Sequence, residues 1–263
     1  MRRHGLRIAT VAVLLFLYLP IGIIALYAFN ADRGQSWPIT SWTTQWFGLA
    51  IDNPDLRNAL ALSLEAATGA TITALVLGTL AALVVHRFRF FGRETVSLLL
   101  VLPIALPGIV TGMALNATFN TLHVPFSVWT IVAGHATFCV VTVYNNVIAR
   151  MRRSSRSIEE ASMDLGATTA QTFRYVTFPA IRTALVAGAL LAFALSFDEV
   201  IVTTFTAGTQ ETIPIWILNN LRLPNQRPIV NVVAVFLVLL SLLPLYLAQR
   251  LTHDGSGAAG GRA

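Results

Sequence analysis

Long apolar runs alternate with short polar segments along the chain. Six of these runs are 18 to 27 residues long, and each contains at most two charged residues. Even 18 residues in a helix extend about 27 Å, close to the bilayer core of about 30 Å. We therefore predict an all-α membrane protein. Its six transmembrane helices are expected at residues 8–29, 59–85, 95–119, 129–148, 183–205 and 230–247.

These six spans are expected to form a single transmembrane domain over residues 1–252. The remaining segment, residues 253–263, reads HDGSGAAGGRA. It is too polar and too rich in glycine to bury a core, so we expect a disordered cytosolic tail. Within the second span, Gly69 and Gly78 are expected where two helices approach closely.

The composition supports a membrane protein and excludes several kinds of enzyme. Only 11% of the residues are charged, against about 25% in a soluble domain. The chain has no lysine, because all 18 basic residues are arginine, so it has no Walker A loop to grip a nucleotide. Cys139 is the single cysteine, and no hydrolase or metal-ligand motif occurs. We therefore expect no cofactor in this chain.

The arginines are distributed unevenly between the two sides of the predicted membrane. If the N-terminus is cytosolic, fourteen of the 18 fall in cytosolic segments, and the other four are Arg33, Arg57, Arg222 and Arg227. The positive-inside rule then predicts a multi-pass protein of the bacterial cytoplasmic membrane with both termini in the cytosol. The basic charge is thus explained by topology, and we expect contact with membrane lipid but not with nucleic acid.

One polar stretch, residues 157–179, lies between the fourth and fifth spans and carries helix-boundary signals. Ser157-x-x-Glu160 is a capping box that starts a helix, and Gly166 is suited to the left-handed turn that ends one. Thr168-x-x-Gln171 is a second, weaker box. We predict two short helices joined at Gly166 to form an elbow.

The end of the elbow is predicted at Pro179, which ends or redirects the second helix near Phe178. Phe173, Val176 and Phe178 are expected to form an apolar face on this helix. Because the elbow lies outside the membrane, another protein is expected to cover that face.

The same stretch resembles the EAA loop of permeases from bacterial ATP-binding cassette (ABC) importers. The family pattern is EAA-x3-G, six residues, then F-x2-I-x-L-P. The residues at these positions are Glu160, Ala161, Ser162, Gly166, Phe173, Val176, Phe178 and Pro179. Ser162, Val176 and Phe178 depart from the pattern but keep its small size or apolar character. The resemblance implies the six-helix, type I (MetI-like) ABC permease fold.

The resemblance also implies partners and a role for the elbow. In the family, this element is a pair of coupling helices that docks on a separate ATP-binding subunit. The expected coupling residues are Ser157, Glu160, Ala161, Gly166, Phe173, Val176 and Pro179. The complete importer would hold a second permease subunit, in a heterodimer with this one, two ATP-binding subunits that bind ATP and Mg²⁺, and an external substrate-binding protein.

Longer segments narrow the resemblance. LLLVLPIALPGIVTGMAL, EASMDLGA and LAFALSFDEVIVTTFTAG look like the second permease of spermidine/putrescine-type importers (PotC/YdcV-like). This implies transport of a polyamine, with 4-aminobutyrate, an aminophosphonate or another small amine as alternatives. A self-contained secondary transporter, which normally shows inverted repeats, and an intramembrane enzyme are the other classes considered, and neither requires the elbow.

Five residues are candidates for the translocation pathway. Asp198 and Glu199 are ionisable groups in the fifth span, where such groups usually line a cavity or bond a neighbour. They point about 100° apart on a helix, so one could serve each role, and Asp198 is the candidate for the pathway. Pro103, Pro107 and Gly108 predict a kink in the third span, either to line the pathway or to aid packing.

Overall fold

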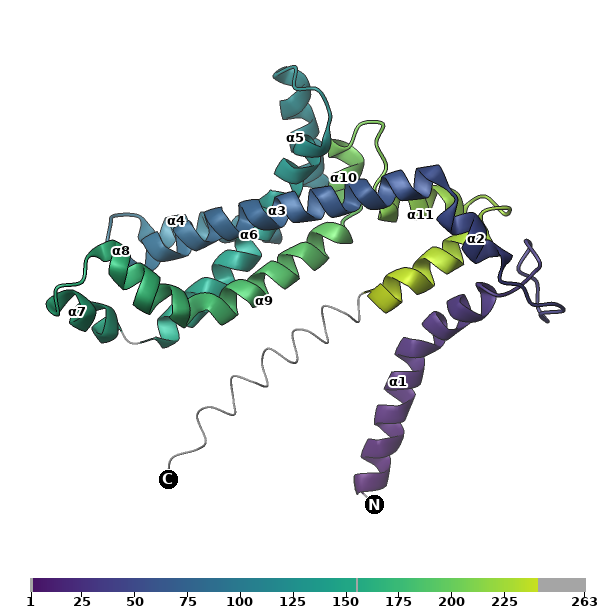
Figure 1. Cartoon of the computed structure of the whole chain (residues 1–263), viewed down its shortest axis with the longest axis horizontal. Coiled ribbons are helices and arrows are strands. Elements are labelled where there is room, and N and C mark those ends of the chain that lie inside the picture. Colours follow the sequence, from purple (N-terminus) through teal and green to yellow (C-terminus); the bar gives the residue numbers. More distant parts are fainter. Residues whose placement is uncertain (1, 155, 241–263) are drawn as a thin grey trace. The chain divides into compact units, whose positions relative to one another are not determined.

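The computed structural model describes residues 2–154 and 156–240, and within them the chain is helical (Figure 1). No strand occurs there beyond a single bridge between Asn30 and Trp42. The prediction of an all-α protein is confirmed. The helices are α1 (Arg2–Tyr27), α2 (Gln45–Ile51), α3 (Pro54–Arg87), α4 (Arg93–Ala105), α5 (Gly108–Thr121), α6 (Val128–Arg153), α7 (Arg156–Asp164), α8 (Thr169–Thr172), the π-helical η1 (Phe173–Thr177), α9 (Phe178–Phe197), α10 (Ile201–Thr206), α11 (Ile213–Leu221) and the helix Arg227–Leu240.

Four helical segments of the described chain are long and apolar enough to cross a membrane. They are Gly5–Tyr27, Pro54–Arg87, Val128–Arg153 and Thr169–Phe197. The bent pair α4–α5 can supply a fifth span, and Arg227–Leu240 is a shorter apolar helix. The predicted sixth span, 230–247, extends beyond residue 240, and the predicted tail, 253–263, lies outside the described residues.

The chain divides into two compact units. Among the described residues, the first unit holds residues 2–58 and 216–240, and the second holds those of 59–215. In the first unit, Trp46 of α2 is buried, and its indole N–H donates to the Asn30 carbonyl at 2.7 Å. Arg33 lies over the same ring. The hydroxyl and backbone N–H of Ser36 donate to Asp32 and, with the Gly34 N–H, lower the pKa of that carboxyl.

In the second unit, α6 packs against α3, α4 and α9, with α7 and α8 at one end (Figure 1). A Cβ placed on Gly78 of α3 would lie 2.8 Å from the backbone oxygen of Val140 in α6. One placed on Gly69 would lie 2.8 Å from Val132. Two helices this close leave no room for larger residues, so the predicted contacts at Gly69 and Gly78 are confirmed.

The third predicted span, 95–119, is broken into two helices. Helices α4 and α5 meet at an angle of 100°, so the predicted kink is present but far sharper than a bend in one helix. Leu106, which precedes Pro107, has the extended ψ of 140°, because proline excludes the helical region for the residue before it. Pro103 lies inside α4 without ending it.

The fifth predicted span, 183–205, is not one continuous helix. Helix α9 begins at Phe178 and ends at Phe197, and α10 follows after a break of three residues, Asp198 to Val200. The sequence shows no Pro or Gly at this break. Its physical cause lies in side-chain bonds to the freed backbone, described below.

Candidate functional site

The elbow contains the predicted turn at Gly166. The Gly166 N–H donates to the Met163 carbonyl at 2.9 Å, and the Ala167 N–H donates to the Ser162 carbonyl at 3.1 Å. This pair of bonds is a Schellman motif, which satisfies the last carbonyls of α7. Gly166 has φ of +89°, a conformation that residues with a Cβ rarely adopt.

The two predicted capping boxes have different outcomes. At the start of α8, the Gln171 N–H donates to the Thr168 hydroxyl, and the Gln171 side chain accepts from the Thr168 N–H at 2.8 Å. This box is confirmed. Helix α7 begins at Arg156, so Ser157 lies inside its first turn rather than before it. Residue 155, which precedes the helix, lies outside the described residues.

Pro179 does not separate the elbow from the following helix, so that prediction is wrong. Residues Thr169–Phe197 form one helical segment, with Pro179 in the first turn of α9. The preceding five residues form the π-helical turn η1. A π turn is wider than an α turn, which lets the helix pass a residue that has no N–H.

The predicted apolar face is also divided. The rings of Phe173 and Phe178 pack together with centroids 6.3 Å apart. Val176 instead lines a cavity on another side of the helix. The wider π turn changes the angular spacing of side chains, so residues that would share a face of an α-helix separate here.

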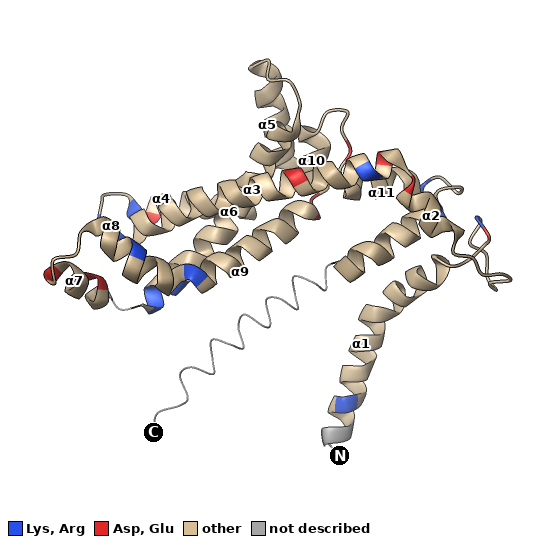
Figure 2. Cartoon of the chain, viewed as in Figure 1, with Lys and Arg blue, Asp and Glu red and all other residues tan. Residues whose placement is uncertain are grey.

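Exposed apolar residues instead gather on α7 and the turn after it. Ile158, Met163 and Leu165 are 56%, 46% and 90% exposed. Ala161 is exposed on the same helix face as Ile158, three residues away. Charged residues surround this end of the second unit, whereas the long helices are largely uncharged (Figure 2). A polar helix end with exposed apolar side chains is typical of a contact surface.

Glu159 forms a charged contact between the elbow and the helical bundle. Its carboxylate lies 3.0 Å from the guanidinium of Arg87, at the end of α3. The Thr177 hydroxyl donates to the other carboxylate oxygen at 2.7 Å. The sequence alone does not predict this contact, because Glu159 and Thr177 lie 72 and 90 positions from Arg87. No local pattern relates residues so far apart.

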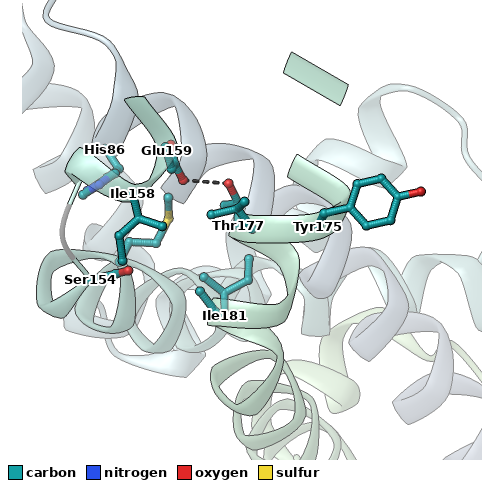
Figure 3. A pocket seen from close by; sticks show the side chains of 10 residues that line it. His86, Ser154, Ile158, Glu159, Tyr175, Thr177 and Ile181 are labelled. Carbon is teal, nitrogen blue, oxygen red and sulfur yellow. Dashed lines mark hydrogen bonds between the residues drawn. The ribbon is translucent and has the colours of Figure 1, made fainter. Parts of the chain in front are cut away.

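A cavity of about 350 Å³ lies beside this contact (Figure 3). Residues from α3, α6, α7, η1 and α9 line it, among them His86, Met151, Ile158, Val176 and Ile181. The Glu159 and Thr177 side chains point toward one another at its wall (Figure 3). Helix α7 is therefore not packed tightly against the bundle along this side.

The candidate pathway acids have different surroundings at the α9–α10 break. The Glu199 carboxylate accepts the Val202 N–H at 2.9 Å, which satisfies a free donor at the start of α10. Asp198 is the C-cap of α9 and is exposed. Within residues 2–154 and 156–240, its carboxylate has no hydrogen bond or ion pair. Asp198 is therefore the acid that remains available to a ligand.

His135 of α6 links both sides of this break. Its Nδ1 lies 2.7 Å from the Ser196 hydroxyl in α9, and its Nε2 lies 2.8 Å from the Thr203 hydroxyl in α10. The Thr203 hydroxyl donates its proton to the Glu199 carbonyl. It therefore accepts from Nε2–H, and Nδ1 accepts from Ser196. The His135 ring thus bridges α9 and α10 across the break, and the Thr203 hydroxyl satisfies the Glu199 carbonyl.

The break between α4 and α5 lies next to the break between α9 and α10. A Cβ placed on Gly108, the first residue of α5, would lie 3.8 Å from Ile201, the first residue of α10. At the other end of this contact, the Asn116 amide donates to the Phe205 carbonyl at 2.7 Å. The predicted pathway residues Gly108 and Asp198 thus lie at neighbouring helix breaks.

The fold and the chain's relatives agree on a family. Residues 74–254 match the family model of the binding-protein-dependent transport system inner membrane component. The chain belongs to this permease family. Its members are subunits of ABC importers in the inner membrane, and ATP is hydrolysed by separate subunits. The chain is thus a transport subunit rather than an ATPase.

Named relatives place the permease more closely. It is 34% identical over 233 residues to the putrescine transport system permease protein PotI of Escherichia coli, covering 85% of this chain and 82% of PotI. It is 33% identical over 243 residues to the spermidine/putrescine transport system permease protein PotC of Haemophilus influenzae, covering 92% and 93%.

A solved structure supports the fold independently. The permease resembles a chain of a bacterial ABC transporter involved in the import of alginate, with a TM-score of 0.72. The match covers 95% of this chain and 94% of the other, at 15% sequence identity. An identity this low supports the permease fold alone.

Proposed function

We propose that this permease forms half of the translocation pathway for a polyamine such as putrescine or spermidine. The observation that carries the proposal is the exposed, unpaired Asp198 carboxylate, in a chain whose named relatives transport polyamines. A carboxylate beside broken helices can accept hydrogen bonds from an ammonium group. The freed carbonyls at the two breaks would supply further acceptors.

We propose further that α7 docks on an ATP-binding subunit. The exposed side chains of Ile158, Met163 and Leu165 lie outside the helical segments that are long and apolar enough to cross a membrane. The occupant proposed is the ATP-binding subunit that an ABC permease requires, with ATP and Mg²⁺ bound there. A second permease subunit and an external binding protein complete the proposed complex.

The proposed topology has six spans with both termini in the cytosol. Five spans correspond to the four long helical segments and the α4–α5 pair. The helix Arg227–Leu240 would provide the sixth by continuing past residue 240. Nine of the fourteen arginines assigned to the cytosol lie in the elbow or at the helix ends next to it, namely Arg87, Arg89, Arg93, Arg150, Arg152, Arg153, Arg156, Arg174 and Arg182. This clustering supports a cytosolic elbow.

Asp198→Asn is expected to lower putrescine uptake by about tenfold or more, because it removes a charge-assisted hydrogen bond. The measurement is uptake of radiolabelled putrescine, spermidine, 4-aminobutyrate and 2-aminoethylphosphonate by cells expressing the complete importer. Glu199→Gln is the matched comparison. Its amide oxygen can still accept the Val202 N–H, so uptake should fall less.

Two results would contradict this proposal. Normal putrescine uptake by a fully assembled Asp198→Asn importer would exclude Asp198 from the pathway. Uptake of 4-aminobutyrate or the aminophosphonate in preference to both polyamines would replace the proposed substrate with another small amine.

A further inference from the structure

Three side chains from distant parts of the second unit form a closed ring of hydrogen bonds. Arg87 Nε donates to Glu159 Oε2 at 3.1 Å, and Arg87 Nη2 donates to the Thr177 hydroxyl at 3.0 Å. Thr177 in turn donates to Glu159 Oε1 at 2.7 Å. The ring joins the end of α3, the middle of α7 and the π turn η1.

The ring is better shielded from water than an ordinary surface ion pair. The Arg87 and Glu159 side chains are 22% and 17% exposed, and Thr177 is 2% exposed. It contains the ion pair between Arg87 and Glu159. Removing one member would leave its partners with unmatched polar atoms in a half-buried place. A connection of this kind holds its elements at a fixed spacing.

Besides the ring, α7 contacts α8 and η1. The Ser162 hydroxyl bonds to Thr172 at 3.2 Å, which ties α7 to α8 within the elbow itself. On the bundle side, the cavity of about 350 Å³ separates α7 from α6 and α9. A displacement of α7 would therefore reach the bundle through the ring, the elbow turn and the short chain connection between Arg153 of α6 and Arg156 of α7.

We infer that the Arg87–Glu159–Thr177 ring transmits the movement of the ATP-binding subunits from α7 to α3 and α9. The inference rests on the proposed docking of α7 on an ATP-binding subunit. The three residues are positioning residues, since none is placed against nucleotide or substrate. Their role is to make α3 and α9 follow α7, so that closure of the ATPase moves both helices together.

The test uses the complete importer in liposomes, with its binding protein and radiolabelled putrescine. Glu159→Gln, Arg87→Ala and Thr177→Val are each expected to keep the ATP-binding subunit bound and its basal hydrolysis intact. Putrescine transported per ATP hydrolysed should fall roughly fivefold or more, the scale of typical couplings between sites. Arg89→Ala is the control, because Arg89 is an exposed arginine two residues beyond Arg87.

A double variant with exchanged charges tests whether Arg87 and Glu159 act as a pair. Arg87→Glu combined with Glu159→Arg is expected to recover much of the ratio lost by either change alone. If each change only destabilised the protein, the double variant would transport less putrescine per ATP than either single variant.

A second measurement needs no substrate. Spin labels at exposed positions Val84 in α3 and Asp164 in α7 report the distance between these helices, and the native Cys139 is buried. When ATP is trapped, this distance should stay constant in the wild type and change in Glu159→Gln.

The outcomes distinguish the ring from the proposed function. Ring variants with a wild-type transport ratio and a wild-type label distance would overturn the ring's role, and so would loss of the ATP-binding subunit from all three. Failure of the wild-type chain itself to retain an ATP-binding subunit, or to import putrescine, would instead contradict the proposed docking or substrate. If only putrescine import fails, the label distance still tests the ring, because that measurement needs the ATP-binding subunit but no substrate.

Discussion

Leu165→Asp is expected to abolish ATP-driven uptake while leaving the permease folded. Leu165 is 90% exposed and follows the last residue of α7, so an aspartate there disturbs little within the chain. If α7 docks on an ATP-binding subunit, the change places a charge in an apolar contact. Loss of a well-buried anchor costs about 3 kcal/mol, or about 100-fold in affinity. The measurement is co-purification of the ATP-binding subunit, followed by uptake.

Leu122→Asp is the control for this prediction. Leu122 follows α5 and is 66% exposed, so it tests the same chemical change far from α7 in the sequence. The ATP-binding subunit should remain bound to this variant. If Leu165→Asp retains the subunit at wild-type stoichiometry, the docking surface does not include the end of α7.

Gly78→Leu is expected to prevent correct packing of α3 on α6. A Cβ on Gly78 would lie 2.8 Å from the Val140 backbone oxygen and 3.0 Å from the Tyr144 nitrogen. Backbone atoms cannot rotate away as a side chain can, so the helices must separate. Overpacking of this kind costs about 1–3 kcal/mol or more. The expected result is a lower melting temperature in detergent and a reduced yield of membrane-inserted protein.

Gly22→Leu provides the comparison for Gly78→Leu. Gly22 is also a glycine inside a helix, but a Cβ placed on it would meet nothing within 4 Å. This substitution should leave the melting temperature unchanged or raise it, because leucine favours helix more than glycine does. Equal effects of the two changes would show that Gly78 is not a point of close helix contact.

Features of the site that depend on neighbouring residues could be predicted from the sequence. Gly166 ends α7 because glycine alone adopts its φ of +89° at little cost. Thr168 and Gln171 cap α8 through bonds only three residues apart. Pro107 breaks the third span because its ring acts on the residue just before it. Each of these effects is local, so the residue types suffice.

Features that depend on distant contacts could not be predicted. The end of α9 at Phe197 is stabilised by His135, 61 residues from Ser196, and the apolar sequence there reads as one helix. The contact of Glu159 with Arg87, 72 positions away, depends on where α3 places that arginine. Pro179 was predicted to end a helix because a π turn has no simple sequence signature.

The π turn also lets the segment Thr169–Phe197 hold one residue more than a regular α-helix of the same length would. Its backbone bonds join residues five apart instead of four apart, so the additional residue is accommodated within that one turn. Removing that residue would let the turn become an ordinary α turn. A deletion of one residue between Phe173 and Thr177 would thus shorten the chain while leaving α8 and α9 in nearly their present relative orientation.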